Sequence, residues 1–172
     1  MPQTLLALCA IMAFAYFALG SQRHDSDVDR RAIANEIELA ATDVAWARIT
    51  ALERLAFDEE AAETGRVRIT PSTAPLGPEE GSTMLYDDVD DWNGVVETQS
   101  VAVGSGTLDF EVEIEVGYVQ DLAPAQPSAL PTLTKDLRVT VVEQQTGPSD
   151  RVPATVTLRR IVTPVGAAAI RR

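Results

Sequence analysis

The chain has 172 residues, of which 45% are hydrophobic and 23% are charged, and this balance excludes wholesale disorder. Its formal net charge of −12 argues against a nucleic-acid partner, because a phosphate-binding surface needs a basic patch. The lone cysteine, Cys9, excludes an intrachain disulfide and a cysteine-rich zinc site, and we expect no cofactor.

The first predicted element is an apolar helix over residues 1–22. No charged side chain precedes Arg23, and apolar residues fall on every side of a helix built from this segment. About 20 such residues in a helix span the core of a bilayer, which is about 30 Å thick. We expect these side chains to face lipid or other helices: Leu5, Leu6, Leu8, Ile11, Met12, Phe14, Phe17 and Leu19.

Three interpretations of residues 1–22 remain open. The first, which we favour, is a retained helix in a membrane or in the core of a helix bundle. The second is a cleaved secretory signal, because Ala18-Leu19-Gly20 fits a small-residue cleavage site, although the positive charge that normally precedes the apolar run of a signal is missing. The third is a buried helix of an ordinary globular domain.

The helical period continues into a second segment, residues 23–64. Apolar residues recur every three or four positions and form one stripe, which we expect to pack on the head: Ile33, Ile37, Ala40, Val44, Ala47, Ala51 and Leu55, widened by Trp46, Ile49 and Leu52. No proline interrupts residues 22–63, so the sequence predicts one long helix, or two collinear ones, that ends near residue 63. Gly20 is the expected weak point, because glycine costs about 1 kcal/mol relative to alanine inside a helix.

The acidic segment, residues 86–94 with the sequence YDDVDDWNG, lies in an irregular connection that also includes a short predicted strand over residues 66–70. Asp87, Asp88, Asp90 and Asp91 offer the oxygen ligands that Ca²⁺ prefers. Their spacing departs from the known calcium-loop pattern, because Trp92 and the following asparagine fall out of register. We therefore expect a solvated acidic turn, with calcium as the alternative.

The third predicted segment, residues 65–172, is a β-rich head. Residues 108–119 alternate strictly between apolar and polar side chains, which is typical of a strand with one face on a core and one face in water. Further strands are predicted over residues 95–103, 135–143 and 154–162. The expected fold class is therefore α+β, with a long N-terminal α-helix packed against an antiparallel β-sheet.

These segments together resemble a type IV pilin-like protein of the minor-pilin or MSHA-pilin kind. The apolar start runs into a charged amphipathic helix, YDDVDDWNG is similar to the acidic loop before the sheet of that family, and GYV, TKDLRVTVV and TVTLRRIVT follow the order of its closing strands. The chain departs from the family at position 5, where Leu5 stands instead of the glutamate of the mature pilin, and it lacks the C-terminal disulfide of many pilins. Either a leader precedes Met1 or the chain is a divergent member.

The resemblance implies a structural subunit of an extracellular filament, or fimbrium, rather than an enzyme. It implies copies of the chain in a helical polymer as partners, together with the pilus assembly machinery. It also implies residence in the inner membrane before assembly and at the cell surface afterwards. The alternative is a membrane-anchored extracytoplasmic binding module or a minor pilin that primes assembly. A role in adhesion, motility, DNA uptake or secretion is left open.

The side chains that usually carry catalysis are isolated in this sequence. His24 is the only histidine, and no nucleophile motif accompanies it. Glu111, Glu113 and Glu115 fall on one face of the strand over residues 108–119, where we expect solvated side chains rather than an acid–base pair. We therefore expect no enzymatic activity.

Overall fold

The computed structural model describes residues 2–58, 61, 70–71, 76–78, 81–104, 106–145 and 151–164, with the backbone alone for residues 2–7, 23 and 25. The chain forms two compact units, Met1–Ile37 and Glu38–Arg172. The first unit consists of the beginning of a long helix. The second contains the end of that helix and all of the β-structure.

The long helix α1 runs from Pro2 to Leu52 without interruption at Gly20. Proline suits the first position of a helix, where its missing N–H removes no helical hydrogen bond. The described residues of α1 beyond its amino end include no other proline, so every interior N–H is available to the preceding turn. The prediction of one long helix is confirmed, and the glycine is tolerated within it.

The predicted end of the helix near residue 63 is wrong, because α1 ends at Leu52. The N–H of Leu55 donates to the carbonyl of Leu52 at 3.1 Å, which is a tighter turn than an α-helix makes. The chain then pairs with the acidic segment: Ala56 donates to the carbonyl of Asp87 at 3.2 Å and accepts from Val89 at 3.0 Å. These tertiary bonds take the backbone groups that further helical turns would have used.

The face of α1 that is buried within the second unit differs in phase from the predicted stripe. Its buried side chains are Ala41, Val44, Ala45, Ile49 and Leu52. Ile37 is also buried, Leu55 is half-buried, and Ile33 is 54% exposed, while Ala47 and Ala51 are exposed. Alanines occur on several sides of this helix, so the hydrophobic pattern alone did not identify which side faces the core. The small alanines allow a close approach to the sheet.

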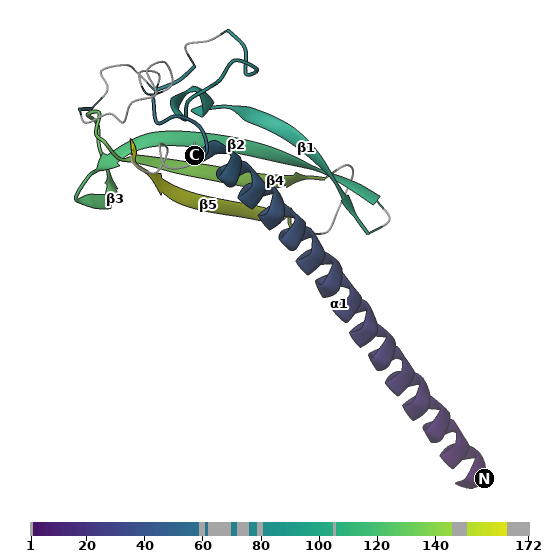
Figure 1. The fold of residues 1–172 in the computed structure, drawn as a ribbon. Coiled ribbons are helices and arrows are strands. Elements are labelled where there is room, and N and C mark those ends of the chain that lie inside the picture. Colours follow the sequence, from purple (N-terminus) through teal and green to yellow (C-terminus); the bar gives the residue numbers. More distant parts are fainter. Residues whose placement is uncertain are drawn as a thin grey trace. The chain divides into compact units, whose positions relative to one another are not determined.

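The sheet has five strands in the order β1-β2-β4-β5, with β3 pairing against the far end of β2 (Figure 1). Their bounds are Val96–Val103 for β1, Gly106–Gln120 for β2, Ala123–Pro127 for β3, Lys135–Gln144 for β4 and Thr155–Val162 for β5. All pairs are antiparallel. A tight hairpin joins β1 to β2, with Gly104 at a φ of 56° that favours glycine.

Four of the strands lie within a few residues of their predicted positions, whereas β3 was missed. Pro124 and Pro127 argued against a strand, but β3 pairs with β2 over only two positions and so loses few hydrogen bonds to its prolines. The strand predicted over residues 66–70 falls almost wholly outside the described residues.

The core lies between α1 and the inner face of β2 and β4. In β2 the inner side chains are Phe110, Val112, Ile114 and Val116, and in β4 they are Lys135, Leu137, Val139, Val141 and Glu143. The alternating residues of β2, among them Glu111, Glu113 and Glu115, are exposed as the sequence pattern predicted. A lysine therefore occupies a core position at the start of β4.

Candidate functional site

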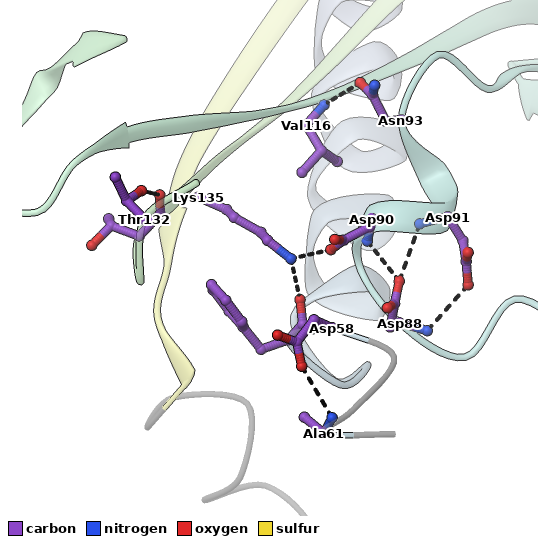
Figure 2. Close-up of polar contacts among 11 residues, drawn as sticks. Asp58, Ala61, Asp88, Asp90, Asp91, Asn93, Val116, Thr132 and Lys135 are labelled. Atoms are coloured by element: carbon purple, nitrogen blue, oxygen red, sulfur yellow. Dashed lines mark hydrogen bonds and ion pairs between the residues drawn. The ribbon is translucent and has the colours of Figure 1, made fainter. Parts of the chain in front are cut away.

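A buried lysine organises the end of the head where α1 stops. The side chain of Lys135 is fully buried, and its ammonium donates hydrogen bonds to the carboxylate of Asp90 and to the carbonyl oxygen of Phe57 (Figure 2). It lies 4.1 Å from the centre of the Phe57 ring and 5.6 Å from that of Tyr118. We call Lys135, Asp90, Phe57 and Tyr118 the lysine centre.

The acidic segment folds around its own carboxylates. Residues Asp90–Trp92 form the short helix η1. The Asp88 carboxylate accepts the N–H groups of Asp90 at 2.8 Å and Asp91 at 3.1 Å, and the Asp91 carboxylate accepts the N–H of Asp87 at 3.2 Å (Figure 2). Short polar side chains stabilise turns by this kind of local bonding. These bonds stabilise the conformation of the segment.

The end of the acidic segment is fastened to the sheet. Asn93 accepts the N–H of Val116 through its side-chain oxygen at 2.9 Å (Figure 2). Gly94, at a φ of 80°, donates to the carbonyl of Ile114 at 2.9 Å. The turn at Asn93 and Gly94 is therefore also an attachment point that fixes the position of Asp90 relative to β2.

Burial controls the protonation of this cluster. The pKa of Asp88 is raised to about 8, mainly by burial and then by the neighbouring charge of Asp90. Burial also raises the pKa of Asp90, while the ammonium of Lys135 acts in the opposite direction. Asp88 is therefore favoured in its protonated form at neutral pH, and Asp90 accepts a hydrogen bond from the lysine.

The expectation of a solvated acidic turn is wrong. Asp88, Asp90 and Asp91 are buried, and only Asp87 of the four candidate calcium ligands is exposed. Within the described part of the chain, no cluster of histidine, cysteine or acidic side chains is arranged to hold a metal ion. Backbone N–H groups and the Lys135 ammonium already donate hydrogen bonds to the carboxylates of Asp88, Asp90 and Asp91.

A second set of contacts joins α1, the acidic segment and β1. The guanidinium of Arg48 on α1 lies 4.2 Å from the centre of the Trp92 ring and pairs with Glu97 on β1. The Trp92 ring meets Tyr86 edge to face, with 5.2 Å between ring centres. These contacts stabilise the junction of the three elements.

The first unit presents an uncovered apolar helix. Within the described side chains of residues 8–19, every large apolar side chain is more than half exposed, from 57% for Leu19 to 83% for Tyr16. Leu8, Ile11, Met12, Phe14 and Phe17 belong to this surface, which we call the apolar helix surface. Leu5 and Leu6 lie outside the residues whose side chains are described.

None of the helices, as far as the described residues extend, has the length and hydropathy that a membrane span requires.

The second unit adds one open groove on the exposed side of α1, about 420 Å³ in volume. Trp46, which is 53% exposed, lies between small residues there and is flanked by Asp43 and Arg54. This face belongs to the widened stripe that the sequence assigned to the head, and the structure leaves it open.

The remaining candidates for chemistry lie apart from the lysine centre. Cys9 and His24 are exposed on the first unit. On β2, Glu111 accepts a hydrogen bond from Gln144 at 3.2 Å, and Glu115 pairs with Arg138 at 3.1 Å. These are surface contacts between neighbouring strands.

Comparisons with protein-family models, with curated proteins and with solved structures found no match. What the structure shows is the fold class, which is α+β: one long N-terminal helix followed by a five-stranded antiparallel sheet. The prediction of the fold class is confirmed.

Proposed function

We propose that the chain is a structural subunit of an extracellular type IV pilus-like filament and assembles through its N-terminal apolar helix. One observation carries this proposal: the side chains of the apolar helix surface point to every side of α1 and are uncovered in the single chain. A helix that is apolar all round is stable only inside a protein core or a membrane. Copies of the same helix, packed against one another, would form such a core.

The composition of the helix suits close packing between copies. Ala10, Ala13, Ala15 and Ala18 are interspersed among the large side chains. Small residues allow helix backbones to approach closely, and the large neighbours then fill the space between them. Burial against other helices gains about 25 cal/mol for each Å² of apolar surface removed from water.

The same surface accounts for the proposed route of the chain. Before assembly, the inner membrane provides the apolar environment for residues 1–22, and assembly machinery moves subunits from lipid into the filament. The heads remain outside the helical core. The net charge of −12 and the exposed glutamates of β2 keep those heads hydrated at the cell surface.

Substitution of Ala13 by arginine tests the proposal. A charge at the centre of a bilayer costs about 2.5–3.5 kcal/mol on insertion scales, which the remaining apolar residues can offset. In a packed helical core the same charge is unpaired and overpacked in every subunit. We expect Ala13→Arg to leave protein in the membrane fraction and to abolish filaments.

The matched control is Thr98→Arg, which adds the same charge at an exposed position of β1. We expect it to assemble at the wild-type level. Membrane-bound and sheared extracellular protein are quantified in the same cells, and mass spectrometry identifies the chain in sheared filaments. Filaments that contain normal amounts of the Ala13→Arg chain would refute a shared helical core. The membrane-anchored binding module would then be the better account.

A further inference from the structure

Lys135 is the only lysine in the sequence, and every other residue among the 14 basic ones is arginine. Its amine is fully buried against the carboxylate of Asp90, whose side chain is 8% exposed. The two residues are 45 positions apart in the chain. A primary amine can form an amide with a carboxylic acid, whereas the delocalised guanidinium of arginine is a poor nucleophile. The single amine of the chain that comes from a side chain therefore lies in contact with a buried carboxyl group.

We propose that Lys135 and Asp90 become joined by a side-chain amide bond, an isopeptide, formed within the folded head. This proposal is independent of the proposed function, because it concerns the head alone. It assigns a covalent modification to residues of this chain and needs no second protein.

The reaction balances within the pair itself. A proton passes from the Lys135 ammonium to the Asp90 carboxylate, which gives a neutral amine and a neutral acid. The lone pair of Nζ attacks Cγ of Asp90 and forms the new C–N bond. One C–O bond of the carboxyl group then breaks, and the oxygen leaves as water with two of the three ammonium protons. The third proton stays on the amide nitrogen, so no oxidant or other reactant is consumed.

The surroundings favour this condensation over the ion pair. Burial of two charges is costly even when they are paired, and an amide removes both of them. The rings of Phe57 and Tyr118 border the amine and exclude the water that would reverse the reaction. The amide N–H that remains can still donate to the carbonyl of Phe57, which already accepts from Nζ. The product therefore leaves this buried acceptor satisfied.

Intact mass spectrometry of the denatured full chain tests the bond. We expect a mass lower than that of the sequence by one water, and the Lys135→Arg chain, which keeps the charge, should show the full mass. A lysine-specific endoproteinase provides the second measurement, because it cuts only after a lysine with a free side-chain amine. We expect it to leave the denatured wild-type chain uncut and to cut Asp90→Ala once, after Lys135.

Both measurements use denatured protein, so a variant that folds poorly still gives an answer. A wild-type chain of full mass that is cut completely after Lys135 would overturn the proposal. A water lost equally by Lys135→Arg would overturn it too, because the loss would then lie elsewhere.

Discussion

Lys135 occupies a core position of β4, and its ammonium meets the carboxylate of Asp90 and the carbonyl of Phe57. Arg138, three residues further along the same strand, pairs with Glu115 at the surface, where both side chains are about half exposed. The two pairs have similar chemistry but opposite burial. Removal of one partner from a buried pair leaves an uncompensated charge, whereas water compensates for the loss at the surface.

We therefore expect Lys135→Ala to lower the free energy of unfolding by about 3–5 kcal/mol, relative to a chain in which Lys135 and Asp90 are still an ion pair. Its matched control, Arg138→Ala, should lower it by only about 0–1 kcal/mol. Urea denaturation of the full chain in detergent, followed by tryptophan fluorescence, measures both, since Trp92 lies in the acidic segment. Equal losses for the two variants would show that the lysine centre is not a buried structural pair.

Asp88 predicts a dependence of stability on pH. Its pKa in the folded chain is about 8, against an ordinary value of 3.8. Because the folded chain holds this proton more tightly than the unfolded chain, the contribution to stability is complete below about pH 4 and is lost as the pH rises towards 8. The loss amounts to at most about 1.4 kcal/mol for each pH unit in that window.

We expect the wild-type chain to be more stable at pH 5 than at pH 8, and Asp88→Asn to reduce that difference. The asparagine keeps an oxygen that can accept the two N–H groups of η1 but has no proton to lose. The pKa of Glu143 is lowered by its hydrogen bonds to Arg151. This carboxyl therefore changes the stability of the fold only at pH values below this window. Denaturation curves at the two pH values provide the measurement. A variant with the full wild-type difference would exclude Asp88 as its source.

At the scale of elements, α1 serves two environments. Residues 38–52 bury Ala41, Val44, Ala45, Ile49 and Leu52 within the second unit, whereas the side chains described over residues 8–33 are all exposed. The burial that stabilises the head therefore comes from the last part of the helix. None of the side chains described over residues 8–33 is buried.

A truncated chain that begins at Asp25 should consequently be a folded monomer with mixed helix and strand. A shorter chain that begins at Trp46 loses four buried residues of α1, Ile37, Ala41, Val44 and Ala45, and should unfold or aggregate. Circular dichroism and gel filtration distinguish these outcomes. Aggregation of the longer chain would show that the head depends on the apolar segment.

The elements that the sequence predicted well are those with a local signal. Alternation over residues 108–119 identified β2, and the absence of proline over residues 22–63 identified a long helix. The end of α1 at Leu52 has no local signal, because it depends on the bonds of Ala56 to the acidic segment. Which face of α1 is buried likewise depends on how the helix packs against the sheet. Alanines lie on several faces of the helix, so the sequence alone did not identify the buried one.

The lysine centre was missed for a related reason. Period two places Lys135 on the same side of β4 as Leu137, and this lysine at a core position was the available signal. Its partner, Asp90, is 45 positions away in an irregular connection. Nothing in the sequence states which connection passes beneath which strand, so the acidic residues were interpreted as a solvated turn.

At the scale of the whole molecule, the proposal assigns different tasks to the two units. The head is closed by its own core, with the inner faces of β2 and β4 covered. The side chains of the apolar helix surface are exposed in the single chain, and the proposal has other copies of the helix cover them. In a subunit of this kind, the free energy of assembly comes mainly from burying one exposed segment. The free energy gained by apolar burial is roughly proportional to the area removed from water.

Cys9 makes the central claim directly measurable, since it is the only cysteine and is exposed on the apolar helix. Sheared filaments and detergent-dispersed chains are treated with an uncharged maleimide that enters detergent micelles, and labelling is followed by mass spectrometry. We expect labelling in detergent and at least tenfold slower labelling in filaments, where neighbouring helices exclude the reagent. Labelling at equal rates in the two samples would contradict a filament core built from this helix.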